Sequence, residues 1–261
     1  MNDGAVVAVT GAASGIGAGI AALLTERGAT VIGVDRVSAP ATPGTWLTVD
    51  LSSPASVRAT AKRLPQIDAL CNVAGVHPRS AEGNEIVTVN YLGTRLFTEC
   101  ALSRMSSGAA IVNMASVAGA GWQARLAIHR ELLACETFEA GLAWLEAHPV
   151  SRSDGYAFSK EALIAWTVLT AAAWLPRGVR MNALAPGPVQ TPAFSAFQAT
   201  RAGAANQDVE LVGRPGRIEE IARVAAFMCG AESGWVNGAV LPVDGGLQAA
   251  YAASGRGPAA L

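Results

Sequence analysis

The sequence predicts a single-domain α/β protein in which helices cover both faces of a parallel β-sheet, and three observations predict it. The length of 261 residues suits one large domain. Hydrophobic residues make up 51% and charged residues 15%, which is enough apolar material for a large buried core. Short β-branched segments alternate with longer helical patterns, and the strands are almost continuously apolar. That pattern indicates strands buried on both faces.

Seven segments have the apolar, β-branched composition of buried strands. In chain order they are Ala5–Val9, Thr30–Val34, Trp46–Val49, Ala69–Cys71, Ala110–Met114, Val179–Leu184 and Val240–Val243. Helices are expected at Gly15–Arg27, Pro54–Leu64, Glu85–Met105, Tyr156–Leu175 and Ile218–Cys229. Ser53 and Pro54 are typical of a helix start, because the hydroxyl caps free N–H groups and proline needs no partner at the first position. Residues 36–44 are too few for an ordinary crossover helix, so we expect a vestigial helix there or none.

Charge and cysteine usage exclude several classes of function. The formal net charge of −1 gives no electrostatic attraction to nucleic acid or to an anionic membrane. The four cysteines and three histidines are widely spaced, which argues against a disulfide scaffold or a metal site and suits a reducing compartment. The uncharged stretch Ala162–Pro176 is shorter than the roughly 20 residues of a membrane span, and no cleavable signal opens the chain. We therefore expect a cytoplasmic location.

A glycine-rich turn follows the first predicted strand and opens the first helix. Its residues Thr10–Gly17 include Gly11, Gly15 and Gly17, with Ser14 and Ile16 between them. Such glycines let the backbone approach a pyrophosphate and aim helix N-terminal N–H groups at it. The pattern alone would also suit an ordinary turn, but its place between strand and helix favours a dinucleotide.

Acidic and small residues at the following strand ends complete the predicted cofactor site. Asp35 ends the second strand, where a carboxylate can accept the ribose hydroxyls and repel a 2′-phosphate. Arg36 could instead hold that phosphate, yet no basic residue stands in the glycine turn, so NAD is favoured over NADP. Asp50 and Leu51 are placed to meet the adenine, although this segment alone could equally be an ordinary strand-to-loop turn. Small residues close the fourth strand, at Asn72, Val73, Ala74 and Gly75.

A second group of residues has the composition of a proton-transfer site. Tyr156 and Lys160 stand four residues apart on one helix face, Ser116 ends the fifth strand, and Asn90 lies in the preceding helix. A tyrosine has a pKa near 10, and a neighbouring ammonium favours its phenolate form. The pair alone would equally suit an exposed aromatic beside a solvated lysine.

Taken together, these motifs resemble the short-chain dehydrogenase/reductase family over essentially the whole chain. The resemblance also rests on the segments Pro186–Val189 with Thr191, and Asn237–Gly238 with Val243–Gly246. It implies a Rossmann-type doubly wound sheet of order 3-2-1-4-5-6-7. One departure is Cys71, where the family usually has another asparagine; we expect little consequence from it.

The resemblance also implies the role of each site residue. Tyr156 would remove the alcohol proton as hydride leaves, Ser116 would hold the substrate oxygen, and Asn90 would anchor a water. Lys160 would bind the nicotinamide ribose and lower the pKa of Tyr156. The residues implied to contact the cofactor are Gly11, Ser14, Gly15, Ile16, Gly17, Asp35, Arg36, Asp50, Leu51, Asn72, Ala74, Gly75, Tyr156, Lys160, Pro186, Gly187, Val189 and Thr191.

Forty positions separate Ser116 from Tyr156, more than is usual in the family. The excess, residues 121–153, has helical patterns at 122–133 and 136–148 and is expected to line the substrate cleft, to shape a subunit contact, or both. Residues 192–214 suit a lid that closes over an apolar substrate, or a loop packed on the core. The expected substrate contacts are Val117, Trp122, Trp144, Phe194 and Phe197.

Within the family, the chain is similar to bacterial dehydrogenases of coniferyl-type alcohols and to the 3α-hydroxysteroid dehydrogenase/carbonyl reductase subgroup. This implies NAD-dependent interconversion of an apolar, aromatic or allylic alcohol and its carbonyl compound. The alternatives are a bulky cyclic ketone or steroid alcohol as substrate, or a catalytically silent NAD-binding sensor. The resemblance further implies a homodimer or homotetramer.

Overall fold

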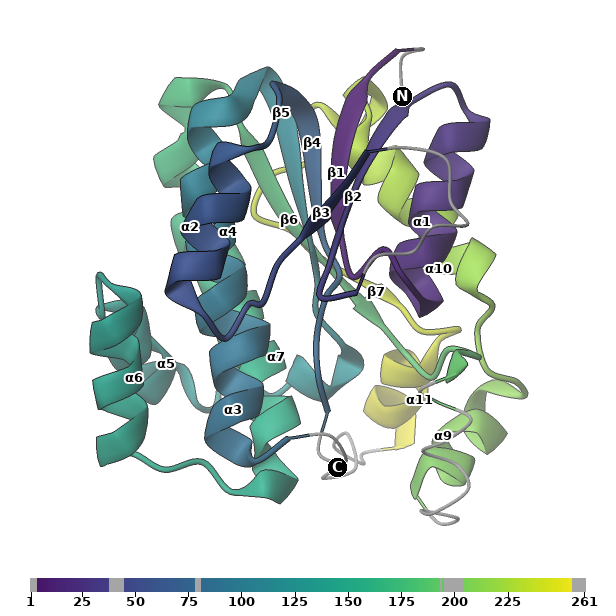
Figure 1. The fold of residues 1–261 in the computed structure, drawn as a ribbon. Helices are drawn as coiled ribbons and strands as arrows, with labels where there is room; N and C mark the ends of the chain where they lie inside the picture. Colours follow the sequence, from purple (N-terminus) through teal and green to yellow (C-terminus); the bar gives the residue numbers. More distant parts are fainter. Residues whose placement is uncertain (1–3, 38–44, 78–80, 193, 195–203, 255–261) are drawn as a thin grey trace.

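The structure is a computed structural model that describes residues 4–37, 45–77, 81–192, 194 and 204–254. Its centre is a seven-stranded sheet of order β3-β2-β1-β4-β5-β6-β7, in which every neighbouring pair is parallel (Figure 1). This confirms the predicted fold and strand order. The strands are β1 Val6–Thr10, β2 Thr30–Asp35, β3 Thr45–Thr48, β4 Ile67–Asn72, β5 Met105–Met114, β6 Arg180–Pro186 and β7 Val240–Val243.

Helices cover both faces of the sheet, and each face has its own buried core. On one face lie α1 (Gly15–Glu26) and α10 (Ile218–Cys229), which pack on each other and on the central strands (Figure 1). The other face carries α2 (Pro54–Lys62), α4 (Thr94–Ala101) and α7 (Arg152–Thr170). The continuous apolarity of the strands thus reflects burial from two sides.

The predicted helix over 85–105 is a chain of shorter pieces. It comprises α3 (Gly83–Val87), a π-helical turn at Thr88–Gly93, α4 and a 3₁₀ turn at Leu102–Arg104. A Cβ atom on Gly93 would lie 2.1 Å from the carbonyl oxygen of Leu51, so this glycine permits a close approach to the loop after β3. The π turn contains Asn90, and such turns are common at functional sites.

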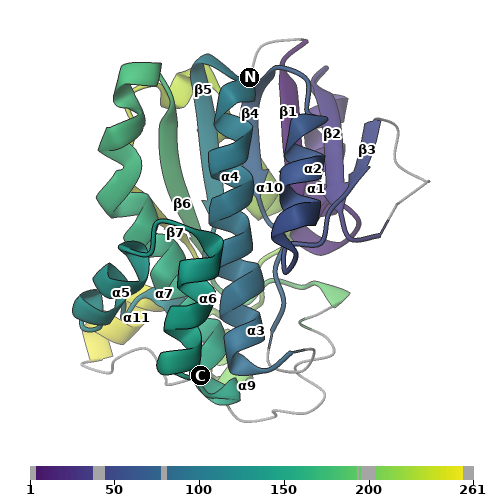
Figure 2. The same ribbon diagram turned by 60° about the vertical axis from the view of Figure 1, so that its left-hand side comes forward.

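The connection between β2 and β3 begins without a helix at Arg36 and Val37; residues 38–44 lie outside the described part. The expected insertion is helical, with α5 at Leu126–Leu133 and α6 at Phe138–Ala147. Figure 2 shows α6 beside α3, with α5 near α7. Buried Leu132, Phe138 and Leu145 join the core on this face of the sheet.

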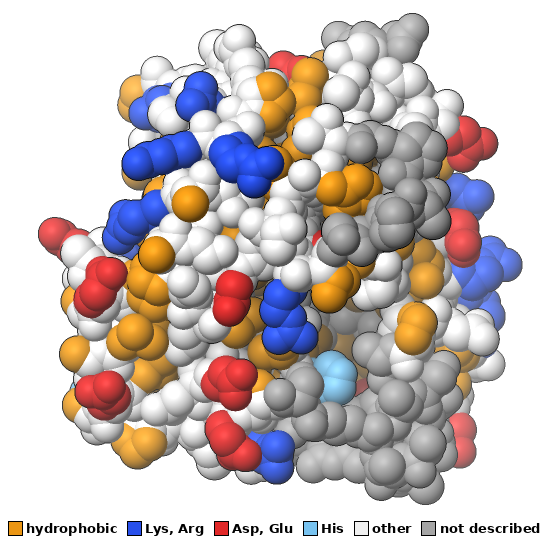
Figure 3. Space-filling model, viewed as in Figure 1, with side chains coloured by type: hydrophobic (Ala, Val, Ile, Leu, Met, Phe, Trp, Pro, Cys, Tyr) orange, Lys and Arg blue, Asp and Glu red, His pale blue; other side chains and the backbone are white. Residues whose placement is uncertain are grey.

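The remaining helices are the 3₁₀ turns Val117–Gly119, Ala171–Arg177 and Ala231–Ser233, with α9 (Ala204–Val212) and α11 (Leu247–Ser254). Charged side chains of both signs are spread over the face in Figure 3, with apolar side chains visible among them over α6. In the described part of the chain, no helix is long and apolar enough to cross a membrane. The described residues also include no group of three or more potential metal ligands among His, Cys, Asp and Glu.

Candidate active site

A cavity of about 940 Å³ opens at the carboxyl ends of the strands. This is the edge of a doubly wound sheet at which ligands bind. Its described lining includes the expected cofactor residues Gly11, Ser14, Gly15, Ile16, Gly17, Asp35, Arg36, Asp50, Leu51, Ala74, Gly75, Tyr156, Lys160, Pro186, Gly187, Val189 and Thr191. Of that set, Asn72 is absent from the described lining.

The glycine turn is shaped by close backbone contacts. A Cβ on Gly17 would lie 2.1 Å from the carbonyl oxygen of Gly11, and one on Gly11 would lie 2.8 Å from the backbone of Ala74. Gly11 and Gly15 have positive φ angles of 70° and 55°, which favour glycine. Among the described contacts the Ser14 hydroxyl does not cap α1, which leaves the helix N-terminus open to the cavity. This cradle fits a dinucleotide pyrophosphate.

Acidic and basic groups line the cavity at the end of β2 and in the loop after β3. The Asp35 carboxylate accepts N–H bonds from Ala13 at 3.0 Å and from Val37 at 3.3 Å, and Arg36 lies next to it in the wall. Hydrogen bonds from Ser52 hold the pKa of Asp50 below its ordinary value; partial burial opposes them, and Arg36 adds a smaller lowering effect. The hydrogen bond from Ala13 thus fixes the Asp35 carboxylate against the glycine turn. The charge of Arg36 acts on Asp50.

Asn72 has a structural position behind the cavity wall. Its side-chain amide donates to Thr98 and to Asn113, each at 2.8 Å, and Asn113 continues the chain to Thr167 at 2.9 Å. The network ties β4 and β5 to α4 and α7. The Asn72 side chain is buried in this network, and its expected contact with the cofactor stays a prediction.

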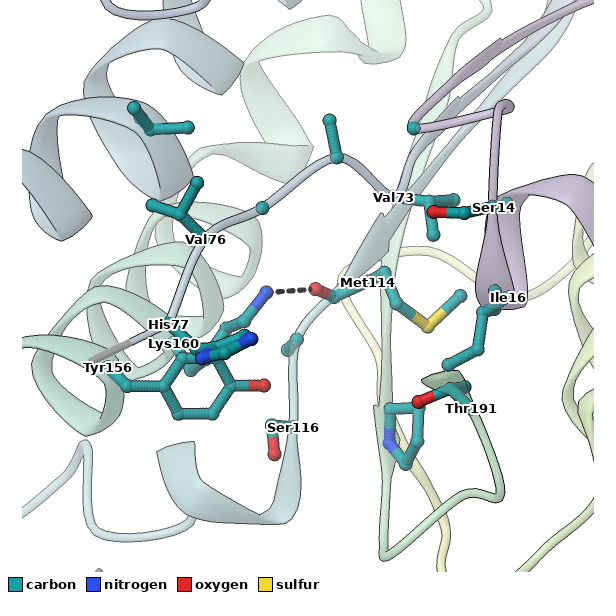
Figure 4. A pocket seen from close by; sticks show the side chains of 18 of the residues that line it. Ser14, Ile16, Val73, Val76, His77, Met114, Ser116, Tyr156, Lys160 and Thr191 are labelled. Atoms are coloured by element: carbon teal, nitrogen blue, oxygen red, sulfur yellow. Dashed lines mark hydrogen bonds between the residues drawn. The ribbon is translucent and has the colours of Figure 1, made fainter. Parts of the chain in front are cut away.

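Three of the four expected catalytic side chains converge in the cavity. Figure 4 shows Tyr156 and Lys160 from α7 beside Ser116, which follows β5, with Ser14, Ile16 and Thr191 across the cavity. The Lys160 Nζ atom lies 5.6 Å from the centre of the Tyr156 ring and donates to the carbonyl oxygen of Met114 at 2.8 Å. Ser116 begins the 3₁₀ turn at 117–119, where its Oγ accepts from Ala118 N at 3.2 Å.

Burial governs the protonation of this pair. It lowers the pKa of Lys160 to about 8. It also raises the pKa of Tyr156 above the ordinary value, and a hydrogen bond with Ser116 partly offsets this increase. Burial thus has a larger effect on the pKa of Tyr156 than the Ser116 hydrogen bond, and the expected lowering of this pKa by Lys160 stays a prediction.

Asn90 lies behind the catalytic group rather than in the described wall of the cavity. Its Oδ1 accepts from Val76 N at 2.7 Å, and its Nδ2 donates to Val76 O at 2.9 Å and to Ser159 Oγ at 3.0 Å. Ser159 in turn donates to the carbonyl oxygen of Tyr156 at 2.8 Å. The side chain thus joins the loop after β4 to α7, while its expected role of anchoring a water stays a prediction.

The expected substrate residues divide into two groups. Val117 and Phe194 line the cavity, whereas Trp122 and Trp144 are not in its described wall. Trp122 packs against a small core that includes Ile164, and Trp144 stacks on His148 with ring centres 4.3 Å apart. Both tryptophans thus pack on the body of the protein, and their contact with substrate stays a prediction. Phe197, like part of the expected lid 192–214, lies outside the described residues.

Several lining residues were not identified from the sequence. His77 follows β4, Glu85 belongs to α3, Ser153 to α7 and Asp208 to α9. Asp208 also accepts a hydrogen bond from the hydroxyl of Tyr251, which connects α9 to α11. No sequence motif marks these side chains, since they enter the cavity only through the packing of separate elements.

Sheet order, glycine turn and cavity define a Rossmann-type protein with a site for a dinucleotide. Family models give the class in more detail: residues 5–127 match "short chain dehydrogenase", and residues 142–248 match "Enoyl-(Acyl carrier protein) reductase". The chain belongs to the short-chain dehydrogenase/reductase family of oxidoreductases, which use a nicotinamide cofactor.

Individual relatives cover nearly the whole chain. Coniferyl-alcohol dehydrogenase of Pseudomonas sp. (strain HR199 / DSM 7063) is 46% identical, over 94% of this chain and 97% of that protein. The 3-alpha-hydroxysteroid dehydrogenase/carbonyl reductase of Comamonas testosteroni is 31% identical, over 94% and 96%. A crystal structure of 3-alpha-hydroxysteroid dehydrogenase from Pseudomonas sp. B-0831, complexed with NADH, superposes with a TM-score of 0.83 at 33% identity, covering 95% of this chain and 99% of that one. The predicted family resemblance is confirmed.

Proposed function

We propose that this protein is an NAD-dependent alcohol dehydrogenase that interconverts an apolar aromatic or allylic alcohol, of the coniferyl type, and its carbonyl compound. The observation that carries the proposal is the convergence of Tyr156, Lys160 and Ser116 in a cavity whose other end is a glycine cradle. The 46% identity to coniferyl-alcohol dehydrogenase supports the choice of substrate.

The chain supplies the proton chemistry of this reaction. The Ser116 hydroxyl holds the substrate oxygen, and the Tyr156 phenolate accepts the alcohol proton. Lys160, anchored on Met114 O, presents its ammonium to the phenol ring and to the nicotinamide ribose. A bound oxidised nicotinamide would supply the hydride acceptor, and its positive charge before the transfer would favour the phenolate form of Tyr156. Asn90 contributes by fixing the Val76 loop against α7.

Asp35 supports the choice of NAD. Its carboxylate is held at the end of β2 by the N–H of Ala13, within the same cavity as the glycine turn. A carboxylate at this position accepts ribose hydroxyls and repels a 2′-phosphate. Arg36 is a competing feature, because a guanidinium binds phosphate well.

The substrate end of the cavity suits an uncharged ring. Val117, Pro188, Pro192 and Phe194 add apolar surface to the lining that includes Tyr156. A steroid or bulky cyclic alcohol is the second candidate, favoured by the similarity to the two hydroxysteroid dehydrogenases. The cavity of about 940 Å³ must also accommodate the cofactor, so only part of it is left for substrate.

A substrate panel tests the proposal. The purified protein is assayed with NAD and equal concentrations of coniferyl alcohol, cinnamyl alcohol, a 3α-hydroxysteroid and cyclohexanol, by following NADH formation. We expect the highest kcat/KM with the two aromatic allylic alcohols. Higher kcat/KM with the steroid would replace the first candidate by the second. NAD binding without turnover of any alcohol or of the matching carbonyls with NADH would instead indicate a sensor.

A further inference from the structure

The start of the insertion is tied to the back of α7 by one arginine. Arg125 donates from Nε to Oε2 of Glu161 and from Nη1 to Oδ2 of Asp154, each at 2.6 Å. Its guanidinium carbon lies 5.3 Å from the centre of the Phe158 ring. The same Glu161 oxygen also lies 2.8 Å from Nε2 of His129, a buried residue of α5. One guanidinium therefore binds two carboxylates nearly two helical turns apart.

The residues that Arg125 contacts lie on the helix face opposite the catalytic pair. At about 100° per residue, Asp154, Phe158 and Glu161 form one stripe, while Tyr156 and Lys160 lie on roughly the other side of the helix. Glu161 is also buried, with a side chain only 6% exposed. Charge-assisted bonds to such a group are stronger than surface ion pairs and fix geometry. The arginine thus holds the back of the segment whose front faces the cavity.

The same short stretch of chain carries Ser116. A Cβ on Gly119 would lie 2.9 Å from the backbone carbonyl of Lys160, and one on Gly121 would lie 3.2 Å from Oε1 of Glu161. These glycines let the segment that begins at Ser116 run directly along α7. The bonds of Arg125 then close this segment onto the helix, so that Ser116 and Tyr156 are connected through both the backbone and the ion pairs.

We propose that Arg125 is a positioning residue: by bridging Asp154 and Glu161 it clamps α7 to the Ser116 segment and so sets the approach of the Tyr156 hydroxyl to Ser116. The inference rests on the proposed function for its kinetic consequence only. The clamp itself is a property of the fold. It gives the inserted helices a task in the site even though their tryptophans do not line the cavity.

Arg125→Lys tests the clamp while keeping the positive charge. A lysine ammonium reaches one carboxylate but cannot donate to two in a fixed fork. We expect kcat with the best alcohol of the panel to fall about 10- to 100-fold, as small misplacements of reacting groups do, with KM for NAD within about twofold. Because the Ser116 contact lowers the pKa of Tyr156, its loss moves the acidic limb of the kcat/KM profile to higher pH. The substitution leaves Lys160 and His77, which line the same cavity, in place.

Arg95→Lys is the matched control. Arg95 pairs with Glu99 at 2.7 Å and donates to the carbonyl oxygens of Leu133 and Cys135, so it anchors the far end of α5 without contacting α7. We expect it to lower the Tm while the pH profile keeps its position. Asp154→Asn, at a more exposed site, cuts only one bond of the clamp, and an intermediate profile shift is expected even if Arg125→Lys folds poorly.

A turnover-free measurement separates this inference from the proposed function. Ultraviolet titration of tyrosinate, with the titration of Tyr156→Phe subtracted, gives the pKa of Tyr156 in each protein. The subtraction removes the contributions of the other two tyrosines, Tyr91 and Tyr251. We expect the pKa of Tyr156 to be higher in Arg125→Lys than in the wild type. An unchanged Tyr156 titration and an unmoved profile in both clamp variants, whatever the substrate panel shows, would overturn the inference.

Discussion

Replacement of Asp35 by asparagine tests the basis of cofactor choice. Asparagine removes the charge but keeps an oxygen that can accept the Ala13 N–H, which now lies 3.0 Å from the carboxylate. The change therefore leaves the glycine turn supported and alters only what the ribose end of the cavity offers. We expect the preference for NAD over NADP to collapse.

The magnitude follows from Coulomb's law and hydrogen-bond energies. Two unit charges 4 Å apart repel by about 1 kcal/mol in bulk water and by about 4 kcal/mol near a protein surface. A phosphate carries about −1.5 to −2 charges, so even the weaker limit gives about 1.5 kcal/mol against NADP. Exchange of charged for neutral hydrogen bonds to the ribose costs NAD about 1 kcal/mol. The ratio of kcat/KM values then changes by about 2.5 kcal/mol, or roughly 50-fold or more.

The assay compares kcat/KM for NAD and NADP in wild type and Asp35→Asn with one alcohol. For the wild type we expect the preference to weaken as salt rises from about 0.05 to about 0.5 M, since screening reduces charge repulsion. Asp35→Asn should show little salt dependence of the ratio. An Asn variant that keeps the wild-type ratio at both salt concentrations would refute the assignment of Asp35.

Two further substitutions address the cradle and the buried lysine. Gly17→Ala places a Cβ 2.1 Å from the backbone oxygen of Gly11, so the turn must open. We expect the Kd for NAD, measured by calorimetry, to rise at least about 10-fold. An unchanged affinity would contradict the assignment of this turn as the pyrophosphate site. Lys160→Met should abolish turnover but raise the free energy of unfolding at pH 7 by about 1–3 kcal/mol, because burial lowers the folded pKa of Lys160 from 10.5 to about 8. The unfolded chain binds this proton more tightly, so the advantage is largest below pH 8 and declines between pH 8 and 10.5, which denaturation at several pH values checks.

The sequence predicts the sheet well because its signals are local. Strands such as Val240–Val243 and helices such as Ile218–Cys229 have the bounds expected from apolar runs and their flanking residues. The helix expected at 85–105 is broken by a π turn that ends at Gly93, where the chain comes close to the backbone of Leu51. Such contacts between distant segments leave no periodic signal in the chain.

The site shows the same difference between features set by local sequence signals and features set by contacts between distant segments. The residues brought together by strand ends and one helix face, such as Ser116, Tyr156 and Lys160, follow from spacing and topology. The positions of Trp144 and Asn72 do not, because each depends on which way a side chain turns when separate elements pack. The Arg125 bridge is another case: two carboxylates on α7 acquire their meaning only when the insertion folds back onto them.

The central claim is that Tyr156 removes the alcohol proton within a preformed NAD site. It is tested most directly by Tyr156→Phe, which deletes one hydroxyl from a half-buried ring. Single-turnover hydride transfer should fall by about 10²–10⁴-fold, the usual contribution of a general base, while the calorimetric Kd for NAD stays within about twofold of wild type. Hydride transfer at the wild-type rate in a variant that binds NAD normally would contradict the claim.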